Sequence, residues 1–183
     1  MRITGGQAKG IQLISPKGLR TRPTSDKLRK AIFDTLGTHV VEARVLDLFA
    51  GSGALGIESL SRGAGFCVFV EKDRIAARSI EGNLAKMGLS SKAQLIRADF
   101  RFAIRRLNHD RRKFDLIFLD PPYQMRLIEE VARSFEGSSL IEPETIIVYE
   151  HFKKTVPPSS ISDVPLAETR EYGQTALSYF YMI

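Results

Sequence analysis

Apolar positions along the chain recur with two different periods, and these predict strands and helices in alternation. Short apolar runs typical of buried strands lie near residues 45–49, 66–71, 94–98, 114–119 and 145–150. Apolar residues at helical spacing predict helices over residues 25–37, 52–61, 73–87, 99–107 and 125–135. Strands and helices in this order predict an α/β fold with a parallel sheet and helices on both faces.

Glycines mark the ends of several predicted elements. Gly63, Gly88 and Gly137 follow three of the predicted helices and are expected to stop them. Two further runs, 164–172 and 176–183, are separated by a short glycine turn and predict a closing hairpin. The sheet is therefore expected to contain seven strands.

The run over 114–119 ends in Asp120, Pro121, Pro122 and Tyr123, an unusual way to end a buried strand. Two prolines donate no backbone N–H and fix φ, so the turn is stiff and its carbonyl groups stay available. A carboxylate and a carbonyl can accept the two N–H bonds of an exocyclic amino group, while an aromatic ring stacks on the heterocycle. The alternative is a plain turn with a surface tyrosine, although Pro-Pro alone would make that turn.

A second motif, G-x-G-x-x-G, is formed by Gly51, Gly53 and Gly56 after the first predicted strand. Glycines permit positive φ and close approach of a ligand, and Glu71, twenty positions after Gly51, can accept ribose hydroxyls. This much also fits a nicotinamide or flavin site, or a glycine turn with a capping Asp. Asp47 precedes the glycines, where a carboxylate suits a cationic ligand better than a pyrophosphate. S-adenosylmethionine is such a ligand.

The two motifs, in this order, resemble the class I S-adenosylmethionine-dependent methyltransferases that modify exocyclic amino groups of bases. Over the whole chain the resemblance is to the RsmD family, whose members methylate guanine N2 in bacterial 16S ribosomal RNA. The matching segments are RITGGQAKG at 2–10, RPTSDKLRKAIF at 22–33, LDLFAGSGALGIESLSRGA at 46–64, FDLIFLDPPY at 114–123 and YGQT at 172–175. The resemblance implies a class I methyltransferase (Rossmann-like), seven-stranded, mostly parallel sheet with an antiparallel last strand and a small N-terminal basic extension.

In that architecture ligands lie beyond the carboxyl ends of the central strands. The resemblance implies that Glu71 binds the ribose, that Asp99 with Ala98 binds the adenine amino group, and that residues 49–53 bind the methionine portion. A helix N-cap is the alternative role for Asp99. The predicted cofactor-binding residues are Asp47, Phe49, Ala50, Gly51, Ser52, Gly53, Glu71, Lys72, Ala98, Asp99 and Asp120. The predicted catalytic residues are Asp120, Pro121, Pro122 and Tyr123.

Positive charge is concentrated near the N-terminus. Residues 1–30 hold eight Lys or Arg against one Asp, a net charge of +7, whereas the whole chain carries +6. This favours an arm that follows RNA phosphates, spaced by glycines into a small hairpin. The predicted RNA-binding residues are Lys9, Lys17, Arg20, Arg22, Pro23 and Thr24. Because the first predicted sheet strand begins near residue 45, a chain without residues 1–23 is expected to fold, and a solvated terminus is the alternative.

A second basic cluster surrounds the predicted helix over 99–107, where a solvated helix face competes with RNA contact. Its members are Arg97, Arg101, Arg105, Arg106, Arg111, Arg112 and Lys113. The three histidines, His39, His109 and His151, show no metal-ligand or triad spacing, so no metal is predicted.

The length of 183 residues predicts one methyltransferase domain, with 1–24 as the RNA-binding extension and 25–183 as the catalytic body. The single cysteine, Cys67, allows no disulfide within the chain and favours a reducing cytosol. No apolar run approaches the roughly 20 residues of a membrane span, and the first residues lack a signal-peptide core. The expected location is cytoplasmic.

The predicted function is transfer of a methyl group from S-adenosylmethionine to the N2 amino group of a guanine in 16S ribosomal RNA. The RNA partner is expected either free or within the assembled small ribosomal subunit. An adenine-N6 methyltransferase acting on DNA or RNA would use the same Asp-Pro-Pro-Tyr chemistry. A nicotinamide-dependent oxidoreductase would leave that motif and the basic arm unexplained, and a non-catalytic ribosome assembly factor would leave the four catalytic residues without a role.

Overall fold

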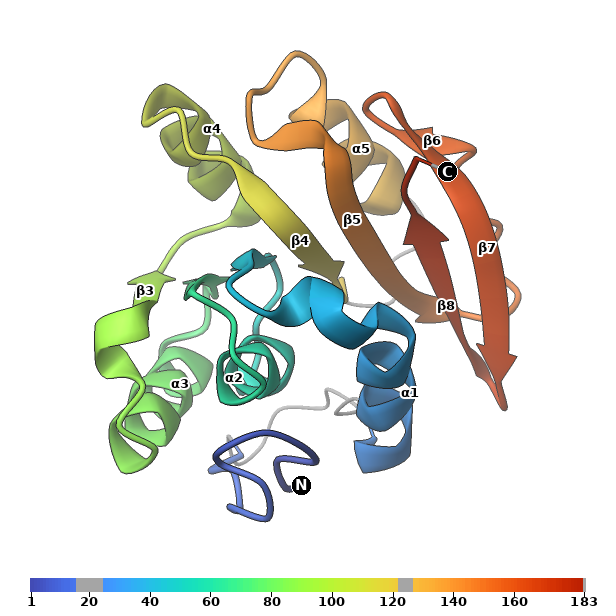
Figure 1. The fold of residues 1–183 in the computed structure, drawn as a ribbon. Helices are drawn as coiled ribbons and strands as arrows, with labels where there is room; N and C mark the ends of the chain where they lie inside the picture. The colour runs from blue at the N-terminus through green and yellow to red at the C-terminus, as the bar shows by residue number, and fades with distance from the viewer. Residues whose placement is uncertain (16–24, 122–126, 183) are drawn as a thin grey trace.

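An eight-stranded sheet runs through the protein in a computed structural model that describes residues 1–15, 25–121 and 127–182. The strands are β1 (Arg44–Asp47), β2 (Phe66–Val70), β3 (Ala93–Ile96), β4 (Phe114–Leu119), β5 (Ile141–Phe152), β6 (Ser160–Ile161), β7 (Val164–Tyr172) and β8 (Thr175–Phe180). Their order is β3-β2-β1-β4-β5-β8-β7-β6, and Figure 1 shows β8 between β5 and β7. Strands β1 to β5 pair in parallel, and β8 runs antiparallel to both β5 and β7. The predicted mostly parallel sheet with an antiparallel last strand is confirmed.

Two details of the sheet differ from the prediction. The short strand Ser160–Ile161 pairs with β7 and was not predicted, because two residues are too few to show a period. Strand β5 begins at Ile141, earlier than expected, across a proline and an irregular register. The hydroxyl of Thr145 stabilises this irregularity, since it donates to the carbonyl of Phe114 at 2.7 Å and accepts from the N–H of Glu142 at 2.9 Å.

Five α-helices pack on the sheet in the positions that helical spacing predicts. They are α1 (Asp26–Leu36), α2 (Ala54–Ser61), α3 (Arg74–Lys86), α4 (Phe100–His109) and α5 (Leu127–Phe135). Helices α1, α2 and α3 cover one face of the sheet and α4 and α5 the other (Figure 1). Ser25, Asp73 and Asp99 cap three of these helices by accepting backbone N–H bonds. Within the described ranges no helix has the length and apolar character to cross a membrane.

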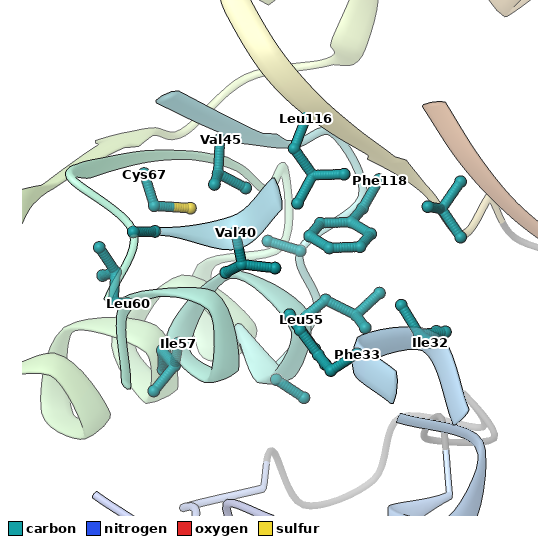
Figure 2. Close-up of a cluster of buried hydrophobic side chains, with 14 of the residues drawn as sticks. Ile32, Phe33, Val40, Val45, Leu55, Ile57, Leu60, Cys67, Leu116 and Phe118 are labelled. Carbon is teal, nitrogen blue, oxygen red and sulfur yellow. The ribbon is translucent and has the colours of Figure 1, made fainter. Parts of the chain in front are cut away.

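Side chains along the central strands alternate between the two cores. In β4, Leu116 and Phe118 pack toward α1 and α2, whereas Ile117 and Leu119 pack toward α4 and α5. Figure 2 shows the first of these cores, where Phe118 lies above Phe33 of α1 and their rings are 5.9 Å apart. A central sheet buried on both faces explains why its strands are nearly continuous apolar runs.

The N-terminal segment contributes side chains to the packed core. It forms the predicted small hairpin, since the backbones of Arg2 and Gln12 pair in an isolated antiparallel bridge. However, Ile3, Ala8 and Leu13 are at most 4% exposed and belong to the same core as α1 and α2. This burial weighs against the expectation that a chain without residues 1–23 folds normally, and that expectation stays a prediction. These three residues fit neither the period of a strand nor that of a helix, so their spacing did not predict their burial.

A buried carboxylate joins this hairpin to helix α2. Glu58 is fully buried and accepts hydrogen bonds from the backbone N–H and the hydroxyl of Thr4, at 2.8 and 2.7 Å. The guanidinium groups of Arg62 and Arg29 neutralise it, at 2.8 and 3.6 Å. At Gly6, φ is +74°, and an added Cβ would lie 1.8 Å from a backbone oxygen of α2. Only glycine permits this close approach.

Candidate functional site

Four acidic residues lie at or just beyond the carboxyl ends of four neighbouring parallel strands. Asp47 ends β1, Glu71 follows β2, Asp99 lies three positions after β3, and Asp120 follows β4. Because the strands are parallel, these ends share one edge of the sheet, next to the point where the strand order reverses between β1 and β4. The structure thus brings the four predicted acidic residues to one edge.

The glycine turn between β1 and α2 is packed on one side and open on the other. Gly51 and Gly53 have φ values of +54° and +80°. A Cβ at Gly53 would meet Ile57 and Ile80 at 3.1 and 3.2 Å, whereas a Cβ at Gly51 would meet no atom within 4 Å. A ligand can therefore approach the backbone at Gly51.

The carboxylate of Glu71 connects this turn to the start of helix α3. One of its oxygens accepts the backbone N–H of Gly51 at 2.8 Å, and the other accepts that of Asp73 at 2.7 Å. A carboxylate has about four acceptor positions, so two remain for hydroxyl groups of a ligand. The position and the half-buried state of Glu71 fit the predicted ribose contact.

Asp47 lies beneath the glycine turn. Its side chain is only 2% exposed in the structure, and Oδ2 accepts the backbone N–H of Gly56 in the first turn of α2 at 3.0 Å. Burial raises the pKa of Asp47 to about 7, although the bond from Gly56 opposes the shift, and the nearby negative charge of Glu71 adds to it. In this structure Asp47 stabilises helix α2, and its contact with a cationic ligand stays a prediction.

Asp99 acts as the N-cap of helix α4, as the alternative role predicts. Its Oδ1 accepts the backbone N–H of Arg101 at 3.0 Å, and the Arg101 guanidinium lies at 3.0 Å from the same oxygen. Burial favours a higher pKa of Asp99, but the bonds from Arg101 and the charge of Lys72 outweigh it, so the pKa is lowered. Asp99 is thus held ionised, and its half-exposed carboxylate can also accept an amino group.

Two of the predicted cofactor residues are half-buried apolar side chains. Phe49 and Ala98 both pack against the core beneath α4, and the ring of Phe49 lies 5.4 Å from that of Phe100 at an angle of 48°. Ala50 is buried, and its N–H donates to Val70 in β2 at 3.0 Å. The remaining predicted cofactor residues are the half-exposed Ser52 and the exposed Lys72. An aromatic face and an ionised carboxylate can hold a purine.

Asp120 lies at the carboxyl end of β4, followed by a buried Pro121. The pKa of Tyr149 in the neighbouring strand β5 is raised to about 12. Burial is the main cause, and the negative charge of Asp120 adds to it. Pro122 and Tyr123 lie outside the described residues, as do five of the predicted RNA contacts, namely Lys17, Arg20, Arg22, Pro23 and Thr24. The sixth predicted RNA contact, Lys9, is exposed on the N-terminal hairpin.

A buried amide that the sequence pattern did not reveal also binds the glycine turn. Asn83 of α3 is fully buried and donates to the carbonyl of Ser52 at 3.1 Å and to that of Ile14 at 3.0 Å. Its oxygen accepts the N–H of Ile14 at 2.7 Å. The turn, helix α3 and the N-terminal segment are therefore linked through one side chain. A lone Asn in an amphipathic helix carries no signal of such a role.

Four of the seven members of the second basic cluster have a partner within the protein. Arg97 pairs with Glu81, Arg101 with Asp99 and Glu130, and Lys113 with Glu142, while Arg112 lies over the ring of Phe66. These contacts favour a structural role for this cluster over RNA contact.

The histidines fit the structural or solvated roles expected of them. His151 is buried and bonds Ser178 at 2.8 Å, while His39 and His109 are exposed. Cys67 is fully buried. Over the described part of the chain, no cluster of three or more His, Cys, Asp or Glu side chains could hold a metal ion.

Comparisons with known proteins agree with this arrangement. The family described as "Conserved hypothetical protein 95" matches residues 1–181. Ribosomal RNA small subunit methyltransferase D of Escherichia coli (strain K12) is 32% identical over 176 residues, which cover 96% of this chain and 87% of that protein. YlbH of Bacillus subtilis (strain 168), provisionally named an rRNA methyltransferase, is 36% identical over 98% of both chains. The solved structure of yhhF from Escherichia coli, provisionally named a methyltransferase, is 31% identical and superposes with a TM-score of 0.86 over 98% of this chain and 96% of that chain.

Proposed function

The chain belongs to the RsmD family and has the class I methyltransferase fold, and on this premise we propose that it methylates the N2 amino group of a guanine in 16S ribosomal RNA. The coarser part of this function, methylation of ribosomal RNA with S-adenosylmethionine as the methyl donor, follows from its relatives. The base, the atom and the RNA species are the proposal. The observation that carries it is the position of Asp120 and Pro121 at the end of β4, beside the glycine turn at the end of β1.

The described residues fit S-adenosylmethionine. Glu71 offers acceptors for two ribose hydroxyls, and Asp99 with Ala98 and Phe49 lines a place for the adenine. The turn is open at Gly51, so its backbone can approach the methionine portion. When bound, the cofactor supplies a methyl group on a positively charged sulfur. The carboxylates along this edge favour that positive charge electrostatically.

The main task of the protein is to prepare a weak nucleophile. The lone pair of guanine N2 is delocalised into the ring, so the nitrogen must move toward tetrahedral geometry before it attacks. Asp120 and the carbonyl of Pro121 would accept its two N–H bonds and direct the lone pair at the methyl group, and the carboxylate of Asp120 would receive the proton that the nitrogen loses. Tyr123 would stack on the base once it is turned out of the RNA. Most of the acceleration then comes from positioning and from fixed charges that match the transition state.

The RNA partner in this proposal is 16S ribosomal RNA, and Lys9 with the basic residues before helix α1 contacts its phosphates. The proposed location is the cytoplasm, where ribosomal RNA is modified. Adenine N6 is the rival target, because a carboxylate and a carbonyl would hold that amino group in the same way.

The choice of RNA is tested by offering the purified protein three substrates with labelled S-adenosylmethionine. These are unmodified 16S ribosomal RNA, small ribosomal subunits that contain it, and 23S ribosomal RNA. The proposal expects label in one or both of the first two and none in the third. Equal label in 23S RNA, or none in any substrate, would contradict it. An Asp120→Ala variant measured beside the wild type controls for a contaminating activity.

A further inference from the structure

A cavity of about 440 Å³ lies beside the carboxyl end of β5, between the start of helix α1 and the turn from β7 to β8. Its size falls in the range of small-ligand sites. Charged, aromatic and hydroxyl side chains line it, namely Ser25, Lys27, Glu150, Glu171, Tyr172 and Thr175. None of these six residues was predicted as a site residue from the sequence.

The register of β4 and β5 places Glu150, which lines the cavity, next to the proposed catalytic residue Asp120. Leu119 of β4 is paired with Tyr149 of β5 in parallel register. The residues that follow them, Asp120 and Glu150, therefore occupy adjacent positions, and neighbouring strands lie about 4.8 Å apart. Paired positions in a parallel sheet share a face, and the preceding pair on that face, Phe118 and Val148, packs toward α1.

Glu150 is unusual among the residues that line the cavity because it is a carboxylate that is only 5% exposed. A buried carboxylate is costly unless hydrogen bonds or charges compensate it. Glu150 has an interaction within the chain, but a carboxylate can accept about four hydrogen bonds. It can therefore accept a further N–H from a group that enters the cavity.

The Watson–Crick edge of guanine presents two adjacent kinds of donor, the N1–H and the N2 amino group. Adenine presents its amino group next to an N1 lone pair, which a carboxylate would repel. Two neighbouring carboxylates thus match guanine and disfavour adenine. A site whose buried carboxylate accepts a hydrogen bond from guanine discriminates strongly against adenine, because adenine leaves that charge without a donor.

We propose that Glu150 determines the specificity for guanine by accepting the N1–H of the target base while Asp120 holds its N2 amino group. This inference rests on the proposed function and names the residue that separates guanine from adenine. The other contents of the cavity suit the rest of a nucleotide. The ring of Tyr172 is half-buried and offers a stacking face, and Lys27 lies in the first turn of α1, where a phosphate is favoured.

The test compares two bases at the position that wild-type protein methylates. 2-Aminopurine keeps the amino group at carbon 2 but carries a lone pair at N1. RNA with guanine or 2-aminopurine at that position is assayed with wild type, Glu150→Gln and Glu144→Gln. Glu144 lies on the same strand at its other end and is exposed, so its variant is a matched control.

Wild type should prefer guanine in kcat/KM. Glu150→Gln should lose about 10- to 100-fold in kcat/KM for guanine, and its preference over 2-aminopurine should narrow by about 10-fold or more, because the amide can donate to N1. The control variant should keep both values. Cofactor affinity, measured by calorimetry, should be unchanged in both variants, which also shows that they fold.

An unchanged preference in folded Glu150→Gln would overturn the inference while leaving the proposed function intact, provided that N2-methylguanosine is still formed. If that variant does not fold, wild type alone decides, since equal kcat/KM for the two bases would overturn the inference. Absence of N2-methylguanosine from the wild-type reaction would overturn both the proposed function and this inference.

Discussion

The carboxylate of Glu71 accepts the backbone N–H of Gly51 at 2.8 Å, so the acidic loop after β2 and the glycine turn after β1 are already joined. The amide of Asn83 binds the same turn by donating to the carbonyl of Ser52. A turn that is fixed at two residues loses little conformational freedom when it binds a ligand, which favours affinity. The proposed cofactor site is thus pre-organised by hydrogen bonds within the fold.

The first prediction follows from this hydrogen bond. Glu71→Ala should weaken S-adenosylmethionine binding by about 1.5 to 3 kcal/mol, because two ribose hydroxyls lose a charged acceptor and the turn loses a restraint. Isothermal titration calorimetry measures the change. Glu129→Ala on helix α5, an exposed residue on the other face of the sheet, is the matched control and should bind normally. Equal affinity in the two variants would place the nucleotide elsewhere.

The second prediction separates chemistry from binding. Asp120→Ala should lower the rate of methyl transfer by at least about 100-fold, because the target amino group loses its charged acceptor. Cofactor affinity should stay within a few fold of wild type, since this carboxylate meets the RNA base more than the cofactor. Single-turnover rates and calorimetry on the same preparation measure both. A loss of cofactor binding as large as that of Glu71→Ala would show that Asp120 has a different role.

The third prediction concerns pH and Asp47. Its pKa of about 7 in the folded protein lies above the ordinary value of 3.8, so the folded protein retains a proton that the unfolded chain has released. This contribution to stability is complete below about pH 4 and is lost as the pH rises through about 7. Asp47→Asn cannot titrate, so wild type should lose stability relative to the variant by up to about 1.4 kcal/mol per pH unit in that window. Urea unfolding of wild type and Asp47→Asn at several pH values measures this difference. If the free energies of unfolding of the two proteins change in parallel with pH, the prediction is contradicted.

The fourth prediction tests whether the N-terminal hairpin is part of the core. Ile3→Ala should lower the free energy of unfolding by about 2 to 5 kcal/mol, because Ile3 is 2% exposed. Ile14→Ala is the matched control in the same segment, since Ile14 is 48% exposed and should cost under about 1 kcal/mol. Chemical denaturation measures both. Small and similar losses of unfolding free energy in both variants would instead support a separable N-terminal arm.

The fifth prediction concerns RNA. Replacing Lys9, Lys17, Arg20 and Arg22 by glutamine should weaken binding to the ribosomal substrate and make its salt dependence shallower. The log-log slope should decrease by about 0.7 to 0.9 for each phosphate that the protein no longer neutralises. Substitution is preferable to truncation here, because the hairpin contributes to the core. Replacing Arg105 and Arg106 on α4 is the comparison, and a slope that changes only in that comparison variant would move the RNA site to α4.

Local patterns in the sequence were sufficient to predict most of the helices and strands of the fold. The runs over β2 and β4 are almost entirely apolar because the sheet is buried on both faces, and this favours parallel strands. The caps Asp73 and Asp99 precede their helices in the chain, so helix starts were visible too. The acidic residues at the strand ends could be placed together because parallel strands end at one edge.

What the sequence could not show depends on contacts between distant residues. The bonds of Glu58 to Thr4 and the amide of Asn83 that binds Ile14 join segments more than 50 positions apart. Neither a strand nor a helix period encodes such pairs. The sequence also did not predict the cavity beside Glu150, because this cavity forms where α1, β5 and the last hairpin meet in space.

The most direct measurement of the central claim is the identity of the methylated nucleoside. Purified protein is incubated with labelled S-adenosylmethionine and unmodified small ribosomal subunits or 16S ribosomal RNA. The RNA is then digested to nucleosides and analysed by mass spectrometry against authentic standards. We expect the label in N2-methylguanosine, and loss of that signal with Asp120→Ala. Label in N6-methyladenosine, or no label in any nucleoside, would contradict the account.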